Sequence, residues 1–317
     1  MKWISLTGIW LSIGLLIIQA GGMLHHDSSE DRLNLKKGEE TIASVTRSDL
    51  SYTAFPLLDE EKLEQWLQHV HDQVYREPIN AAIGSGGELR PGENGQGLDK
   101  ERMSEQIKAF FYSRGSAEIQ IPIIILYPKV DSELLLTIME KPIGSYVTYF
   151  NSRNKNRAHN IVLAAKAINN AVLFPGESFS FNGTVGMRTA EKGYVRAPII
   201  VRGELSEGIG GGICQVSSTL FNAIDRAGLK IVERYSHSRH VAYVPPGRDA
   251  TVSWGGPDFV FSNPYNQPIL IRTWVNGGMV TVSIFSSETI QHSPRVVPGA
   301  SQDVPEEIKD GAIEKAG

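Results

Sequence analysis

The last third of the sequence combines one helical pattern with a series of short strand patterns, and this combination limits the fold of the chain. The spacing of apolar residues predicts a helix that begins after three glycines at residues 210–212. Short apolar segments bounded by turn residues predict strands at residues 230–235, 250–254, 259–261, 269–275 and 279–285. The sequence Asn-Gly-Gly at 276–278 joins the last two strands as a β-hairpin. We therefore expect an α+β fold in which one main helix packs on antiparallel strands.

Composition excludes several classes of protein. The chain has 317 residues, of which 41% are hydrophobic, so it is long enough for two domains with buried cores and too apolar to be disordered throughout. Its single cysteine excludes an intrachain disulfide framework and a cysteine-rich zinc module. The formal net charge of −4 provides no basic excess to neutralise phosphates, so we expect no nucleic-acid partner.

The first 24 residues have the pattern of an export signal. Lys2 precedes an uncharged, mostly apolar run that ends in small residues near Ala20. A membrane-spanning helix needs about 20 apolar residues, and residues 20–24 could extend the run to that length. A cleaved signal peptide and an uncleaved membrane anchor are therefore alternatives. Both place the rest of the chain outside the cytoplasm, either secreted or anchored to the membrane by this segment.

Polar segments divide the remaining sequence. Residues 25–49 are rich in charge and are expected to form a solvated linker, and residues 287–317, with scattered prolines and charges, a flexible tail. Between them we expect a small α+β domain at residues 50–141 and a second α+β domain at residues 142–286. The first is predicted from an amphipathic helix beginning near Asp59, a helix capped by Asp99, and a strand at residues 118–126.

The most specific chemical signal is Cys214, at the start of the helix that follows the glycines. On a helical projection, Val216, Leu220, Ala223 and Ala227 form the apolar stripe, and Cys214 falls on the other side. Unpaired N–H groups and the dipole of a first helical turn stabilise an anion, so we expect a lowered pKa for this thiol. The alternative is a small buried cysteine beneath a glycine turn, because free cysteine is among the most buried residue types.

A cysteine nucleophile needs a base, and two histidines follow the strand predicted at 230–235. His237 and His240 lie where loops carry functional groups, and an imidazole beside a helix-start thiolate is the arrangement of many cysteine enzymes. Asp249 and Asp258 are candidates to orient the imidazole. Cys214 and the two histidines are also conceivable zinc ligands, but the histidines would point in opposite directions along an extended segment, and structural zinc usually has four ligands. We therefore expect no metal and no other cofactor.

Several residues around the cysteine are candidates for substrate binding. The glycines remove side chains, so that a peptide substrate can approach the backbone closely, and N–H groups at the helix start could form an oxyanion hole. Arg234, Arg239 and Arg248 are candidates to hold carboxylates of the substrate. The alternative is that these arginines are solvated residues at strand ends. The predicted substrate-binding residues are Gly210, Gly211, Gly212, Gln215, Ser218, Arg234 and Arg248.

Residues 143–285 resemble the VanW domain, a family named after an accessory protein of glycopeptide (vancomycin) resistance clusters. The matching segments include PGESFSFN at 175–182, GGGICQVSSTL at 210–220, GRDA at 247–250 and DFVFSN at 258–263. The family pattern includes Cys214, Asp249 and Asp258, and it extends to His237 and not to His240. The resemblance implies a protein of the bacterial cell envelope, mainly of Gram-positive bacteria, without a settled biochemical activity.

The preceding domain also carries a resemblance. Residues 78–83, 89–99 and 119–122 are similar to a peptidoglycan-binding domain that precedes several cell-wall modules, among them L,D-transpeptidase domains, which use Cys and His on peptidoglycan stem peptides. An unspecialised spacer domain is the alternative. The resemblance implies that peptidoglycan or another wall polymer is the partner of the protein.

Two functions follow from these residues. In the first, Cys214 attacks a peptide carbonyl of the cell wall, His237 acts as general base and then acid, and Asp249 or Asp258 orients the imidazole. In the second, the protein is a non-catalytic wall-binding or scaffold protein, and the cysteine and glycines only build a tight turn beneath the helix. The reactivity of the thiol in the folded protein separates these hypotheses.

Overall fold

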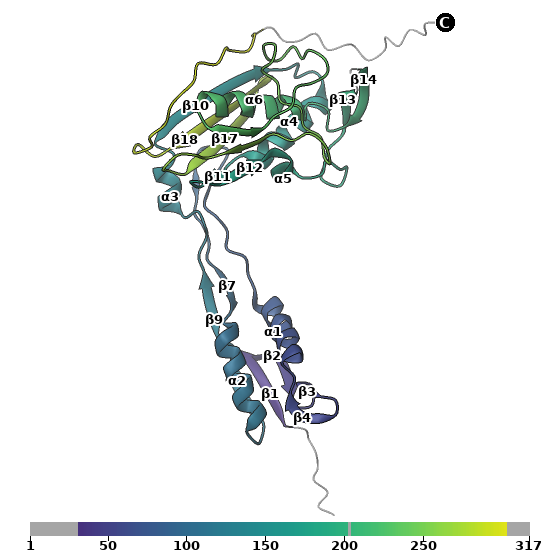
Figure 1. Ribbon diagram of the computed structural model, residues 1–317, viewed down its shortest axis with the longest axis vertical. Helices are drawn as coiled ribbons and strands as arrows, with labels where there is room; N and C mark the ends of the chain where they lie inside the picture. The colour runs from purple at the N-terminus through teal and green to yellow at the C-terminus, as the bar shows by residue number, and fades with distance from the viewer. Residues whose placement is uncertain (1–30, 202–203, 303–317) are drawn as a thin grey trace, which may run out of the picture. The chain divides into compact units, whose positions relative to one another are not determined.

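The computed structural model describes residues 31–201 and 204–302, which form two compact units (Figure 1). The first unit comprises residues 31–76 and 96–124, and the second comprises 77–95 and 125–302. The segment expected to be a signal peptide or anchor lies outside the described residues. None of the helices in the described parts of the chain is both long and apolar enough to cross a bilayer.

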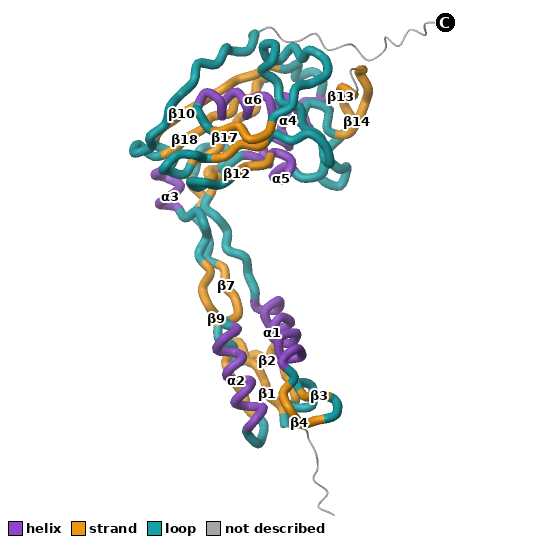
Figure 2. The backbone as a smooth tube through the Cα atoms, viewed as in Figure 1, coloured by secondary structure: helices purple, strands orange, loops and turns teal. Residues whose placement is uncertain are grey.

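The first unit is a three-stranded sheet with two helices (Figure 2). The strand order is β2-β1-β8, with β1 and β2 antiparallel and β1 and β8 parallel. Its elements are β1 (Arg32–Lys37), β2 (Glu40–Thr46), β3 (Ser51–Tyr52), β4 (Phe55–Leu58), α1 (Glu60–Val74), α2 (Lys100–Tyr112) and β8 (Ala117–Gln120). Both predicted helices are confirmed: the Asp59 carboxylate accepts hydrogen bonds from the first turn of α1, and Asp99 accepts one from Arg102 N of α2.

The prediction of a linker at residues 25–49 is wrong for the part that the structure describes. Residues 32–46 form the β1–β2 hairpin, in which Leu33 and Leu35 are fully buried. The alternation of these leucines with polar residues is the pattern of a half-buried strand, although the surrounding charge favoured a solvated segment. The predicted boundaries 50–141 are also wrong, because residues 77–95 and 125–141 belong to the second unit.

The strand predicted at 118–126 is interrupted at Pro122. Residues 117–120 form β8 of the sheet, and β9 (Ile123–Leu126) pairs instead with β7 (Gly95–Leu98). Proline has no N–H to donate to a neighbouring strand, which ends the ladder at this position.

The second unit is built on a four-stranded antiparallel sheet with the order β10-β18-β17-β11. The main helix α6 packs against β10 and β18, and α4 packs against β17 and α6 (Figure 1). These elements are β10 (Lys141–Tyr149), α4 (Lys155–Ile168), β11 (Val172–Leu173), α6 (Ile213–Arg226), β17 (Ile269–Asn276) and β18 (Met279–Ser286). The α+β fold and the hairpin at 276–278 are confirmed.

Smaller elements surround this layer and complete the second unit. A second antiparallel sheet has the order β12-β16-β15, and a separate hairpin pairs β13 with β14. These elements are β5 (Ala82–Ile83), β6 (Leu89–Arg90), α3 (Ser132–Thr137), β12 (Ser178–Ser180), α5 (Phe181–Val185), β13 (Arg196–Val201), β14 (Glu204–Ile209), β15 (Lys230–Glu233) and β16 (Val260–Ser262).

The segment 250–254, predicted as a strand, has no strand partner in the structure. Its backbone is bonded instead to side chains of α6: Ala250 N donates to Ser218 Oγ (2.9 Å), and the Cys214 thiol donates to Val252 O (3.5 Å). Thr251 N donates to Tyr235 O (2.8 Å) and Ser253 N donates to Pro257 O (2.9 Å), so helix side chains and backbone groups outside any sheet together satisfy this segment.

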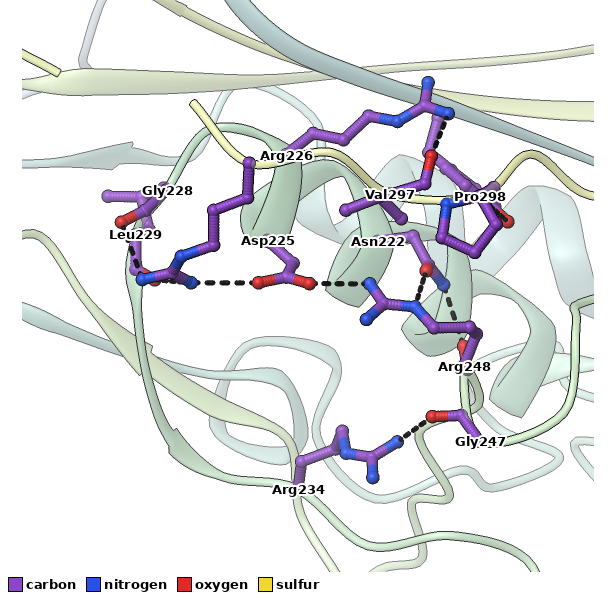
Figure 3. A network of polar contacts seen from close by, with 12 residues as sticks. Asn222, Asp225, Arg226, Gly228, Leu229, Arg234, Gly247, Arg248, Val297 and Pro298 are labelled. Carbon is purple, nitrogen blue, oxygen red and sulfur yellow. Dashed lines mark hydrogen bonds and ion pairs between the residues drawn. The ribbon is translucent and has the colours of Figure 1, made fainter. Parts of the chain in front are cut away.

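The part of the predicted flexible tail that the structure describes, residues 287–302, is packed on the second unit. Val297 is 6% exposed. Its carbonyl accepts a hydrogen bond from the Arg226 guanidinium (2.9 Å), and the Tyr146 hydroxyl donates to Pro298 O (2.9 Å) (Figure 3). The prolines keep this segment out of a sheet, but side chains of α6 and β10 bind its carbonyls. The prediction of a flexible tail is therefore wrong for these residues.

Two neighbouring valines test this packing. Val297→Ala is expected to lower the free energy of unfolding by about 1–2 kcal/mol, because two buried methyl groups leave a cavity. Val296 is fully exposed, so Val296→Ala is expected to change it by less than about 0.5 kcal/mol. Urea denaturation of both variants measures the difference, and equally small effects would show that the segment is not part of the folded unit.

Candidate active site

Cys214 lies in the first turn of α6, as predicted. The N-cap residue Gly212 has a φ of +103°, which is unfavourable for residues with side chains, and it provides no side-chain cap. Cys214 is half-buried, and its sulfur lies 3.5 Å from Val252 O and 3.8 Å from Thr251 Oγ1. Val216, Leu220 and their neighbours are buried as expected, but so is the opposite side of the helix. The helix is therefore enclosed on its sides, and the Cys214 thiol is partly exposed only at its N-terminal end.

The His237 imidazole joins Cys214 to Asp249. Its Nδ1 lies 2.6 Å from Asp249 Oδ2, and the His237 backbone N–H donates to the same oxygen, also at 2.6 Å. The imidazole also interacts with the Cys214 thiol closely enough to shift the pKa of both groups, and Nε2 is the ring nitrogen that Asp249 does not engage. The structure thus brings together three of the four predicted catalytic residues in the order of a nucleophile, a base and an orienting carboxylate.

The electrostatics of the three groups are coupled. Burial raises the pKa of the Cys214 thiol, but the hydrogen bond and charge of His237 outweigh it and bring this pKa below its ordinary value. Burial lowers the pKa of His237, but its bonds to Cys214 and Asp249 and their charges raise it above its ordinary value. Burial raises the pKa of Asp249, and the two bonds from His237 lower it again. The shifts of Cys214 and His237 both favour the thiolate–imidazolium pair over the neutral pair.

Arg234 holds the segment that carries Asp249. One guanidinium nitrogen, Nη1, donates to Gly247 O (2.9 Å) (Figure 3) and to Asp249 O (2.6 Å). The guanidinium also lies over the ring of Phe221. The sequence analysis predicted that Arg234 binds a substrate carboxylate. In the structure it binds backbone carbonyls of its own chain instead. Because it holds the backbone carbonyl of Asp249, Arg234 is a positioning residue for Asp249.

Asp258 lies elsewhere and does not orient the histidine. Its carboxylate accepts hydrogen bonds from Ser180 Oγ (2.5 Å) and from the backbone N–H groups of Asn182 (2.8 Å) and Phe259 (2.7 Å). These bonds tie the segment before β16 to the start of α5. The sequence left open whether Asp249 or Asp258 contacts the imidazole of His237. In the structure it is Asp249.

The glycines before the cysteine are approached by the chain itself. A Cβ on Gly211 would lie 2.5 Å from Pro198 O of β13, and a Cβ on Gly212 would lie 3.0 Å from the Arg157 side chain. The fully buried Asn160 of α4 also donates to Gly211 O (3.0 Å). Other parts of the chain thus occupy the space beside Gly211 and Gly212. The prediction that these two glycines admit a substrate backbone is therefore wrong. At Gly210 the neighbouring side chains are those of Ile213 and Arg188.

Gln215 and Ser218 are also engaged inside the protein. Gln215 is 1% exposed, accepts a hydrogen bond from Arg157 and donates to Thr148 Oγ1 and Tyr149 O. Ser218 is fully buried and donates to Cys214 O (2.8 Å). Both therefore stabilise the start of α6, and the prediction that they bind substrate is wrong.

Arg248 stabilises the other end of the helix. Its guanidinium donates to Asn222 Oδ1 (2.7 Å) and Asp225 Oδ2 (2.7 Å) (Figure 3). It also lies over the ring of Phe221. These contacts fix the loop just before Asp249. The predicted carboxylate-binding role of Arg248 is not supported, because its Nε and Nη2 bind Asn222 and Asp225 of the same chain.

A surface hollow of about 190 Å³ lies beside the histidine. His237, Asp249, Arg239 and His240 are among its lining residues, and Arg239 and His240 are exposed. The His237 side chain, which is 7% exposed, forms part of the wall of the hollow, and Arg239 provides an exposed cation.

Sequence reasoning missed Arg188, which lies near the cysteine. Its Nη2 donates to Asn182 Oδ1 (2.7 Å), whereas its Nη1 is buried and has no hydrogen-bond partner among the described residues. Burial lowers the pKa of Arg188, and the negative charge of the nearby Cys214 acts in the opposite direction. No local sequence pattern marks an arginine in a loop as a site residue. Only the contact of Arg188 with Gly210, four residues before the cysteine, shows that it lies near the site.

Tyr243 was also missed. Burial raises the pKa of Tyr243, and so does the negative charge of Cys214, while a hydrogen bond with Ser218 acts against both. The hydroxyl therefore stays protonated near the sulfur.

Comparison with known proteins assigns the family. A family model described as VanW like protein matches residues 156–285. The chain is 55% identical over 281 residues to protein YoaR of Bacillus subtilis, and the alignment covers 88% of this chain and 93% of that protein. It is 29% identical over 157 residues to the vancomycin B-type resistance protein VanW of Enterococcus faecalis, covering 48% of this chain and 57% of that one. No solved structure matches the chain significantly.

The family match includes the cysteine, the histidine and both aspartates discussed above, and it agrees with the resemblance seen in the sequence. The similarity of the preceding domain to a peptidoglycan-binding domain stays a prediction. With a 55% identical relative matched over nearly its whole length and a family model that spans the site, the chain belongs to the VanW-like protein family.

Proposed function

We propose that the protein is a cell-envelope enzyme that uses Cys214 for acyl transfer or hydrolysis on wall peptides. The observation that carries this proposal is the position of His237, whose Nδ1 lies 2.6 Å from Asp249 Oδ2 and whose imidazole lowers the pKa of the Cys214 thiol. A cysteine with only a packing role does not require an imidazole oriented by a buried carboxylate.

The proposed reaction has two steps. The Cys214 thiolate attacks the carbonyl carbon of a peptide bond, a C–S bond forms, and the C–N bond breaks as the His237 imidazolium gives its proton to the leaving amine. Water or a second amine then attacks the thioester and gives its proton to His237, which releases the thiolate. Asp249 keeps the imidazole oriented and stabilises its charged form. Backbone N–H groups at the start of α6 would stabilise the oxyanion.

The substrate and the location follow from different observations. Arg239 at the rim of the hollow and Arg188, with its unpartnered Nη1, are the groups that we assign to carboxylates of a bound peptide. The printed name of the VanW relative connects that protein to vancomycin resistance. Together with the export signal, this supports an extracytoplasmic protein, secreted or anchored by residues 1–24, with peptidoglycan or another wall polymer as its partner.

A covalent adduct tests the proposal. Incubating the protein with soluble peptidoglycan fragments is expected to give an acyl-enzyme on Cys214, detected as a mass increase that hydroxylamine removes. Cys214→Ala is expected to abolish the adduct. Asp258→Asn serves as the control, because Asp258 does not contact His237, and it is expected to retain the adduct. Wall binding without any adduct would favour the alternative, a non-catalytic wall-binding or scaffold protein, and contradict the enzyme.

A further inference from the structure

Several segments of the first unit meet at one end of its sheet. Arg32, at the start of β1, pairs with Thr46 at the end of β2, and the parallel strand β8 begins at Ala117 beside Leu33. The chain therefore enters the unit, turns from β2 into the β3–β4 hairpin, and passes from α2 into β8 at this end (Figure 1). We name it the proximal end, and its exposed apolar residues are Tyr52, Phe55, Leu57 and Tyr112.

Polar contacts fix the first described residues to this end. The Arg47 guanidinium donates to Asp31 Oδ2 (2.7 Å) and to the carbonyls of Phe110 (3.1 Å) and Gly115 (3.0 Å) at the end of α2. Gly115 N also donates to Asp31 Oδ2 (2.9 Å). The point at which the chain enters the unit is thus held beside the last turn of α2, and its position does not depend on the preceding residues.

The exposed side chains at the proximal end are unusually large and apolar. Tyr52 is 50%, Phe55 65%, Leu57 58% and Tyr112 70% exposed. Exposed apolar residues are ordinary when scattered, but a group of aromatic and aliphatic residues at one end marks an interaction surface. Tyrosine beside phenylalanine and leucine is the composition of side chains at a membrane–water interface.

The sequence before the unit indicates which surface these residues contact. The apolar run at residues 1–24 is the predicted membrane segment, and only seven residue steps separate Leu24 from Asp31. An extended chain spans about 3.6 Å per residue, so the proximal end lies within roughly 25 Å of the end of that segment. The rest of the chain leaves the unit at the opposite end, where α1 ends at Val74 and β8 at Gln120.

We propose that the proximal end of the first unit contacts the outer surface of the lipid bilayer, with Phe55 and Leu57 of the β3–β4 hairpin inserted among the lipid headgroups and Tyr52 and Tyr112 at the interface. This inference rests on the membrane attachment in the proposed function and is independent of the chemistry of Cys214. It makes the first unit a support that stands on the membrane rather than a freely tethered domain.

Site-specific fluorescence tests the contact in the full chain. In a Cys214→Ser background, Phe55→Cys is labelled with an environment-sensitive dye, and the protein is reconstituted into phosphatidylcholine and phosphatidylglycerol vesicles that contain headgroup spin-labelled lipid. Glu39→Cys is the matched control, because Glu39 is exposed in the β1–β2 turn at the opposite end of the same unit. We expect quenching at position 55 to exceed that at position 39 at least threefold, and Leu57→Ser to reduce it.

The outcomes separate this inference from the proposed function. A membrane-bound chain with equally weak quenching at both positions overturns the inference alone. A full chain that does not associate with vesicles overturns the membrane attachment as well. A dye response that depends on protein concentration but not on lipid assigns the surface to a second copy of the chain and also overturns the inference.

Discussion

Replacing His237 with alanine is expected to move the pH at which Cys214 becomes reactive from below the ordinary value of a thiol to above it. The imidazole lowers the pKa of Cys214 by its hydrogen bond and its charge, whereas burial raises it. Without the imidazole, the effect of burial remains, and the thiol stays protonated at neutral pH. Each unit by which the pKa rises reduces the thiolate fraction at neutral pH about tenfold. Because the thiolate is the nucleophile, alkylation slows in proportion.

The same pair of groups fixes the pH profile of activity. The pKa of Cys214 is lowered and that of His237 is raised, and both shifts increase the share of the thiolate–imidazolium pair at intermediate pH. Below the pKa of Cys214 the nucleophile is protonated, and above the pKa of His237 the leaving amine receives no proton. We therefore expect a bell-shaped dependence of kcat/KM on pH, with the acidic limb due to the cysteine and the basic limb due to the histidine.

Rates of alkylation by iodoacetamide, measured across the pH range, test the prediction for His237→Ala. Circular dichroism verifies that the variant is folded. His240→Ala is the matched control: His240 is exposed, lines the same hollow as His237 and is expected to leave the rates unchanged. Asp249→Asn is expected to give rates between those of the two alanine variants, since the imidazole stays but loses its carboxylate partner. Identical profiles for His237→Ala and the unmodified protein, or labelling only after denaturation, would identify Cys214 as a packing residue and favour the non-catalytic alternative.

Gly211→Ala is expected to lower the free energy of unfolding by about 2–3 kcal/mol, one of the largest effects of a single methyl group in this chain. A Cβ at this position would lie 2.5 Å from Pro198 O and 2.7 Å from the backbone of Ala197, so either β13 or the start of α6 must shift. The shift also breaks the geometry of the hydrogen bond from Asn160 to Gly211 O.

Chemical denaturation measures this effect. Gly299→Ala is the control, because a Cβ there has no atom within 4 Å and the φ of Gly299 is not in the left-handed region. It is expected to change the stability by less than about 0.5 kcal/mol. If Gly211 served mainly to admit a substrate, Gly211→Ala would keep its stability and lose only activity, and that result would contradict the close packing described above.

Local patterns in the sequence were sufficient for the parts of the protein that depend on near neighbours. The caps at Asp59 and Asp99 and the turn at 276–278 each follow from residues within one turn or hairpin, and all three are found in the structure. The position of Cys214 in the first turn of α6 follows from the glycines before it and the apolar spacing after it. The hairpin at 32–46 had the right alternation, but its charged surroundings indicated a linker.

The sequence by itself determined the α+β class and the helix that begins at the cysteine, and its resemblance to the VanW domain selected His237 rather than His240 as the expected base. Only the tertiary structure decided which carboxylate orients that base, because Asp249 and Asp258 both follow His237 at distances that the chain can span. It also decided that Gly211 faces Pro198, that Val252 faces the sulfur of Cys214, and that the segment after Ser287 is packed. Periodicity and capping act over a few residues, whereas these contacts join residues far apart along the chain, whose approach depends on how the sheet and helices pack.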